Sequence, residues 1–130
     1  MQDKVDYWLD LCNDDLITAK ALLDAKRPLH MGFFCHLIAE KALKAVIASI
    51  TDDVPPRTHD LRKLAMLGNL LDDLSAEQRT LMEKLLPLHI EARYPEYKIK
   101  MLETLTTDYC KQILSETEAF LCWIKRRLEK

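Results

Sequence analysis

The sequence predicts an all-α protein, folded as an antiparallel up-and-down bundle of four to five helices. Of its 130 residues, 48% are hydrophobic and only two are glycine, so turn formers are too few for a strand-rich fold. Apolar residues recur at alternating spacings of three and four, which is the period of an amphipathic helix. Prolines and capping residues divide these runs, and the links between them are short, which favours antiparallel neighbours.

The first two runs predict helices over residues 3–25 and 29–50. In the first, Val5, Trp8 and Cys12 begin one apolar stripe, and Pro28 ends the run because the residue before a proline leaves the α region. The second run has a broader apolar face, and its alanines would let a neighbouring helix come close. We therefore expect the second helix at the centre of the bundle.

The paired prolines of residues 55–56 predict the longest break in the chain. A third helix is expected to start near Thr58, with Thr58 or Asp60 as its cap, and to reach residues 72–73. A fourth starts at Ser75, where S-x-x-Q forms a capping box.

Pro87 lies inside the predicted fourth helix and should kink it. The last helix begins at Thr106 or Thr107 and runs for about six turns, close to the end of the sequence. No internal repeat or long linker divides the chain, so we expect one domain over residues 1–130.

Charge and cysteine spacing narrow the class of protein. The net charge of −2 argues against a binder that holds nucleic acid by overall basicity. No apolar run approaches 18 residues and the start lacks a signal-peptide pattern, so we expect a cytoplasmic protein without membrane spans.

The cysteines have no metal-finger spacing and lie in apolar surroundings, which predicts small core residues and no metal site: Cys12, Cys35, Cys110 and Cys122. Without a glycine-rich phosphate loop or a nucleophile elbow, no cofactor is expected, and classical nucleotide hydrolysis and acyl transfer are set aside.

The segment around Arg93 is the strongest candidate for function. Arg93, Tyr94 and Tyr97 surround a proline-locked turn, where a guanidinium can hold phosphate and phenol rings can stack on bases. A lid of aromatic side chains over the end of the bundle is the structural alternative. Lys98 and Lys100 add positive charge beside this turn.

Histidines supply the other candidates. His89 lies four residues before Arg93 on one helix face, a spacing that suits a general base beside a phosphate-holding cation. His59 next to Asp60 can form an acid/base couple, but capping and loop anchoring are the favoured interpretation of this pair. Glu40 with Lys41 is interpreted as an ion pair at the bundle edge, with the alternative that one of them points into a cleft. His30 and His36 lie on opposite sides of the second helix, without a partner at ligand spacing.

Three ordered blocks carry a resemblance to a known family. They are A-E-K-A-L-K at residues 39–44, T-H-D-L at residues 58–61 and A-R-Y-P at residues 92–95. Together they resemble the HEPN family (higher eukaryotes and prokaryotes nucleotide-binding domain) over most of the chain. The resemblance implies a helical bundle that is often a homodimer and is often encoded beside a minimal nucleotidyltransferase as a toxin–antitoxin-like pair. Many members are metal-independent ribonucleases.

The chain departs from the ribonuclease pattern of that family, an arginine followed by four to six residues and then a histidine. Arg93 matches the arginine, but the permitted positions hold Lys98, Ile99 and Lys100. The resemblance therefore predicts a nucleotide- or RNA-binding partner of a minimal nucleotidyltransferase with weak or no nuclease activity. It also makes Tyr97, and less so Tyr94, a candidate for modification by that partner. An active ribonuclease using Arg93 with His89 or His59, and a structural interaction module, remain alternatives.

Overall fold

The computed structural model describes residues 3–90 and 95–129, apart from the side chains of residues 3, 90 and 95–97. Within this part of the chain every regular element is helical, which confirms the predicted fold class. The elements are α1 (Asp3–Asp24), α2 (Pro28–Ile50), α3 (Leu61–Leu67), the 3-10 turn η1 (Leu71–Asp73), α4 (Ala76–Ile90), α5 (Pro95–Thr104) and α6 (Thr107–Leu128).

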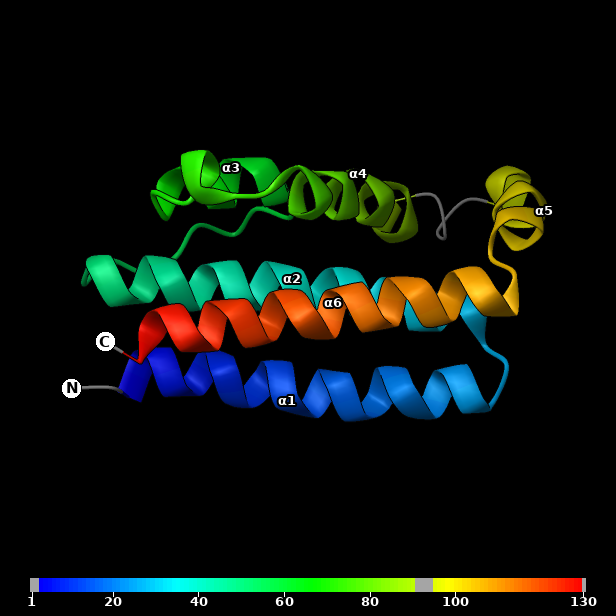
Figure 1. The fold of residues 1–130 in the computed structure, drawn as a ribbon, viewed down its shortest axis with the longest axis horizontal. Helices are drawn as coiled ribbons and strands as arrows, with labels where there is room; N and C mark the ends of the chain where they lie inside the picture. Colours follow the sequence, from blue (N-terminus) through cyan, green and yellow to red (C-terminus); the bar gives the residue numbers. More distant parts are fainter. Residues whose placement is uncertain (1–2, 91–94, 130) are drawn as a thin grey trace.

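The four long helices alternate in direction along the chain (Figure 1). Helix α2 contacts all five other α-helices of the described structure. Helices α1 and α6 lie along α2, α3 and α4 cover it on the side away from α1, and the short α5 crosses one end of the bundle (Figure 1). The central position predicted for the second helix is therefore confirmed.

Side-chain caps set the helix starts where the sequence predicted them. The Asp60 carboxylate accepts a hydrogen bond from the Lys63 amide at 3.2 Å, which selects Asp60 over Thr58 as the cap of α3. The capping box at α4 is confirmed, since the Gln78 amide donates to Ser75 Oγ at 3.0 Å and the Ser75 amide donates to Gln78 Oε1 at 2.9 Å. Thr106 caps α6.

Two elements differ from the prediction. Helix α3 ends at Leu67 instead of reaching residue 73, because Gly68 and then Asn69, with a φ of 59°, turn the backbone away before η1. Helix α5 was not predicted as an element of its own. It starts at Pro95, a favoured residue at a first helical position, and it buries Met101 against the bundle.

The core follows α2, where thirteen of its residues are buried. Gly32 allows α4 to come close, since a Cβ at this position would lie 3.0 Å from Leu88 Cδ1. His36 lies one helical turn after Gly32 on α2, and His89 directly follows Leu88 on α4. The close approach of α2 and α4 therefore brings two histidines together.

Three of the four cysteines are core residues, as predicted, and one is not. Cys12, Cys35 and Cys110 are buried, and burial raises the thiol pKa of Cys12 and of Cys35 to about 12. Cys122 is exposed, so its predicted core position is wrong. It lies on α6, where Ala119, one turn earlier, is also exposed.

Candidate functional site

Five polar side chains meet between α2, the loop before α3 and the end of α4, and we call them the His–Glu cluster. They are His36, Glu40 and Lys44 from α2, His59 from the loop and His89 from α4. The first three are spaced by four residues and therefore share one helix face. Four of the five are buried, and only His59 is exposed, with 55% of its side chain accessible.

Glu40 connects the cluster. Its Oε2 accepts a hydrogen bond from Lys44 Nζ at 3.0 Å, and its Oε1 accepts one from His59 Nδ1 at 2.9 Å. Burial alone would raise the pKa of this carboxyl, but the hydrogen bonds and charges of His59 and Lys44 hold its pKa below the ordinary value. Glu40 is therefore an ionised carboxylate with a residue exposure of only 3%.

The ionised carboxylate fixes the proton on His59. A carboxylate can only accept, so Nδ1 of His59 must carry the hydrogen, and Nε2 is the nitrogen left for other partners. Because His59 is exposed and Glu40 is not, this imidazole presents a fixed edge to solvent.

The three imidazoles pack on one another. The ring centre of His89 lies 4.5 Å from that of His36 and 4.5 Å from that of His59. The Phe33 ring stacks on His89, with the two ring centres 5.5 Å apart. His36 is fully buried, and its pKa is lowered to about 4, first by burial and then by the neighbouring His89, against the opposing effect of Glu40. Its Nδ1 is 3.6 Å from Glu40 Oε1, just beyond hydrogen-bond length.

One sequence interpretation of these residues is corrected and another is confirmed. Glu40 pairs with Lys44, whereas Lys41 donates to Asp15 at 2.7 Å, because adjacent helical residues point in different directions. For His59 and Asp60 the favoured capping interpretation is confirmed, because the Asp60 carboxylate caps α3, and the acidic partner of His59 is Glu40.

His36 and Lys44 are the cluster members that sequence reasoning missed. His36 was considered without a partner at ligand spacing, although it lies four residues before Glu40. The spacing of His36, Glu40 and Lys44 was the available signal.

The predicted site around Arg93 falls largely outside the described residues. Arg93 and Tyr94 lie there, as does the side chain of Tyr97, so the His89–Arg93 pairing stays a prediction. Lys98 and Lys100 are exposed on α5. The structure thus brings Glu40, His59 and His89 together at the helix end that precedes Arg93.

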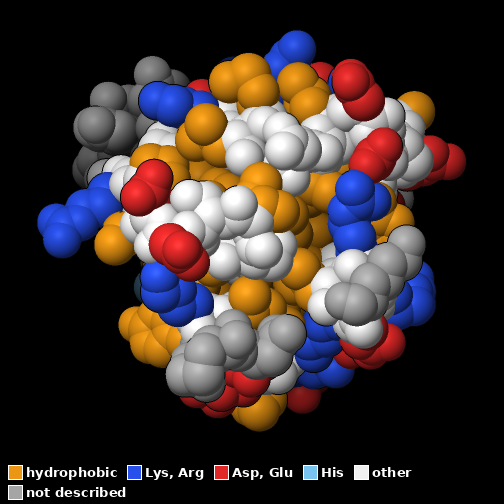
Figure 2. Space-filling view, turned by 90° about the vertical axis from the view of Figure 1, so that its left-hand side faces the viewer, with side chains coloured by type: hydrophobic (Ala, Val, Ile, Leu, Met, Phe, Trp, Pro, Cys, Tyr) orange, Lys and Arg blue, Asp and Glu red, His pale blue; other side chains and the backbone are white. Residues whose placement is uncertain are grey.

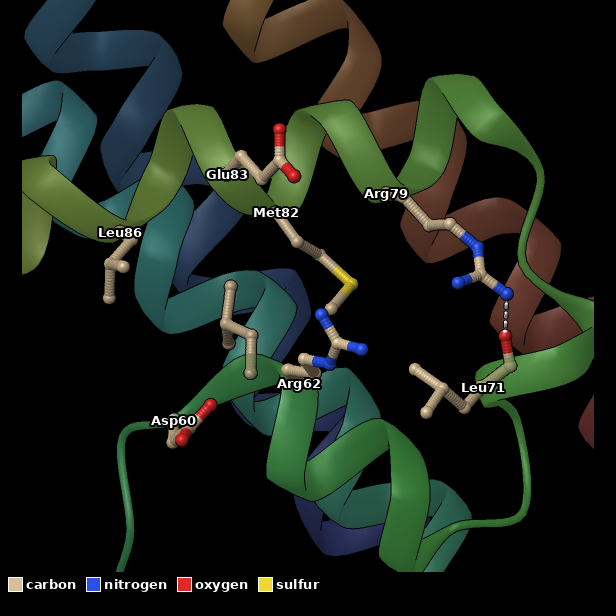
Figure 3. Close-up of a pocket in the computed structure, with 8 residues that line it drawn as sticks. Asp60, Arg62, Leu71, Arg79, Met82, Glu83 and Leu86 are labelled. Atoms are coloured by element: carbon tan, nitrogen blue, oxygen red, sulfur yellow. Dashed lines mark hydrogen bonds between the residues drawn. The ribbon is translucent and has the colours of Figure 1, made fainter.

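A pocket of about 370 Å³ opens between α3 and α4 beside the cluster (Figure 3). Arg62 reaches toward Met82 within it, and the guanidinium of Arg79 donates to the Leu71 carbonyl (Figure 3). Leu86 also lines the pocket, three residues before His89 on α4, so the pocket and the cluster are neighbours along one helix. Asp60 and Glu83 line the pocket as well, so it offers both guanidinium and carboxylate groups beside an apolar wall.

The basic end of α6 is engaged in contacts. Lys125 Nζ donates to Asn13 Oδ1, and Arg127 pairs with Asp73, both at 2.5 Å. On the face at this end of the bundle, acidic and basic side chains are interspersed around apolar ones (Figure 2). The described charged residues at this end therefore do not form a uniformly positive or uniformly negative surface.

Comparison with known families places these observations in context. The family model described as HEPN domain matches residues 5–128, nearly the whole chain. The chain belongs to the HEPN family, which associates it with a nucleotide- or RNA-related function. No curated protein and no solved structure matches it. None of its described helices is long and apolar enough to cross a membrane.

Proposed function

We propose that the chain binds nucleotide or RNA at the end of α4 and acts as the partner of a minimal nucleotidyltransferase in a toxin–antitoxin-like pair, with weak or no nuclease activity. Family membership supports the nucleotide-related part of this proposal. The nucleotidyltransferase partner, a homodimer and modification of Tyr97 or Tyr94 are proposed from the family resemblance. A cytoplasmic location is proposed from the sequence pattern alone.

The observation that carries the binding site is the Glu40-held His59. Its imidazole edge is exposed and fixed at 2.9 Å by a buried carboxylate, so little conformational freedom is lost when it contacts a ligand. His89 packs against it, and Arg93 follows His89 by four residues in the sequence. The Arg93 guanidinium is suited to phosphate oxygens, whereas the free Nε2 of His59 can accept a hydrogen bond from a hydroxyl or amino group of the ligand.

The proposal of weak cleavage rests on the residues after Arg93. Lys98 and Lys100 stand where ribonuclease members carry a histidine, and both are exposed. A lysine ammonium can neutralise phosphate, but it carries no acceptor lone pair with which to take a proton. These positions therefore favour binding over bond cleavage.

Binding of ATP and short RNAs should weaken at least about tenfold in Arg93→Ala, because a charge-assisted contact to phosphate is lost. Fluorescence anisotropy or calorimetry measures this. Arg62→Ala is the matched variant, since Arg62 lines the neighbouring pocket and is exposed. A loss confined to Arg62→Ala would move the site into that pocket, and wild-type affinity in both variants would remove nucleotide binding at this face.

An active ribonuclease is the second candidate, favoured by the Glu40–His59 contact. A carboxylate that fixes one imidazole nitrogen and leaves the other exposed is the arrangement of a general base. In this case, RNA cleavage should persist in chelator and fall about 100-fold or more in His59→Gln. RNA that stays intact in excess wild-type protein, or cleavage unaffected by His59→Gln and His89→Gln, rules it out.

A further inference from the structure

Three metal-ligating side chains of the His–Glu cluster converge at one buried point. One ligand atom from each of His36, Glu40 and His89 can be chosen so that all three lie within 4.8 Å of one another. All three residues are buried, two on α2 and one on α4. The helices that hold them are kept close by Gly32, so the arrangement is built into the fold.

His36 points to a ligand independently of this spacing. Its side chain has no accessible surface, and neither ring nitrogen makes a hydrogen bond of regular geometry to the described residues. Buried polar nitrogens without such a bond are uncommon and costly. Glu40 Oε1 lies 3.6 Å from His36 Nδ1, a separation that two ligands of one ion adopt more readily than two hydrogen-bond partners.

We propose that His36, Glu40 and His89 form a binding site for a divalent transition-metal ion of the Zn²⁺ type. Two imidazoles and one carboxylate are a ligand set that zinc accepts, with metal–ligand distances of about 2.0–2.2 Å. Such distances separate the ligands of a tetrahedral site by roughly 3.4 Å. His36 Nδ1 and Glu40 Oε1, which are 3.6 Å apart, already match this separation. Movement of the His89 imidazole toward them completes the set of three ligands.

Ligand type selects the class of ion. Imidazole nitrogens suit zinc, cobalt and nickel, whereas Mg²⁺ and Ca²⁺ prefer all-oxygen surroundings. Among the described residues, only Glu40 supplies an oxygen ligand in this group. The site should therefore discriminate against Mg²⁺ and Ca²⁺.

The remaining two cluster residues shape the site. Lys44 holds Glu40 Oε2 at 3.0 Å, which leaves Oε1 on the side of the two histidines. Its ammonium also repels a cation, so Lys44 limits the affinity. His59 borders both Glu40 and His89 and is the exposed member of the cluster, so it lies between the proposed site and solvent.

The test uses the full chain after removal of metals with a chelator. Calorimetry with ZnCl₂ should give one ion per chain, and zinc should raise the thermal midpoint because it binds only the folded site. CoCl₂ should give the visible absorption of cobalt with nitrogen ligands in low coordination. MgCl₂ should produce neither effect. A wild-type protein with no stoichiometric zinc or cobalt binding overturns the proposal.

Variants locate the ion. His36→Gln should weaken zinc binding by about tenfold or more, while His30→Gln should leave it unchanged, since His30 is an exposed histidine on the same helix. Equal losses in both variants, or none in either, contradict the site. Should His36→Gln fail to fold, Lys44→Met provides the second test. It removes the repelling charge but keeps an apolar stem, so affinity should increase about tenfold, and unchanged or weaker binding overturns the arrangement. None of these measurements depends on nucleotide binding.

Discussion

Replacing Glu40 with alanine is expected to lower the free energy of unfolding by about 3–5 kcal/mol. The carboxylate is buried and bonded to Lys44 at 3.0 Å and to His59 at 2.9 Å. Its removal leaves the Lys44 ammonium, which is only 7% exposed, without its carboxylate in a low-dielectric site. Urea unfolding followed by circular dichroism measures the loss.

An exposed ion pair of the same chain provides the control. Lys20 and Glu118 lie 3.2 Å apart with side chains 52% and 42% exposed, so Glu118→Ala should cost less than about 1 kcal/mol. The double variant Glu40→Met with Lys44→Met should regain part of the stability, because it removes both buried charges. A Glu40→Ala variant as stable as Glu118→Ala would show that the buried pair contributes little.

Acidification of the metal-free protein from pH 6.5 to pH 4 should remove about 3 kcal/mol of stability through His36. Its pKa is lowered from 6.5 to about 4 in the folded protein, so in this window the unfolded chain binds a proton that the folded chain does not. Stability therefore falls as the pH falls through 6.5, and this contribution levels off below about pH 4. Denaturant unfolding at a series of pH values, with chelator present, measures the slope.

The groups that face His36 also contribute to the dependence of stability on pH. His89 and the His59 side chain disfavour the charged form of His36, whereas Glu40 and the His59 backbone favour it. The lowered pKa of Glu40 adds a further acid-side loss, which begins below the ordinary carboxyl value of 4.5. His36→Leu should flatten the slope above that value, and His30→Gln should retain it. An unchanged slope in His36→Leu would assign the acid sensitivity to other groups.

Local patterns explain why the fold could be predicted. Periodicity identified the long helices, and the side chains that cap them, Asp60, Ser75 and Thr106, act within three residues of their partners. Helix α5 could not be predicted in this way, because Met101 is the only buried side chain among residues 98–104 and the helix follows directly on a sequence that is typical of a turn.

The site depends on contacts that sequence spacing does not express. His59 lies nineteen residues from Glu40, and the approach of α4 to α2 depends on packing at Gly32. Only the α2 residues of the site, which are spaced by four, could be predicted from the sequence to lie together. The charges were assigned to the sequence neighbour Lys41, whereas helix geometry selects Lys44.

Two kinds of element cover the His–Glu cluster, a loop and a helix. Glu40 is shielded by His59, which belongs to the loop between α2 and α3, so exposure of the carboxylate requires displacement of a loop and not of a helix. His36 is shielded by His89, which belongs to α4, and is exposed only when α4 separates from α2. Solvent and small solutes should therefore reach the carboxylate on the timescale of loop motion, and the inner imidazole only through the much rarer separation of two packed helices.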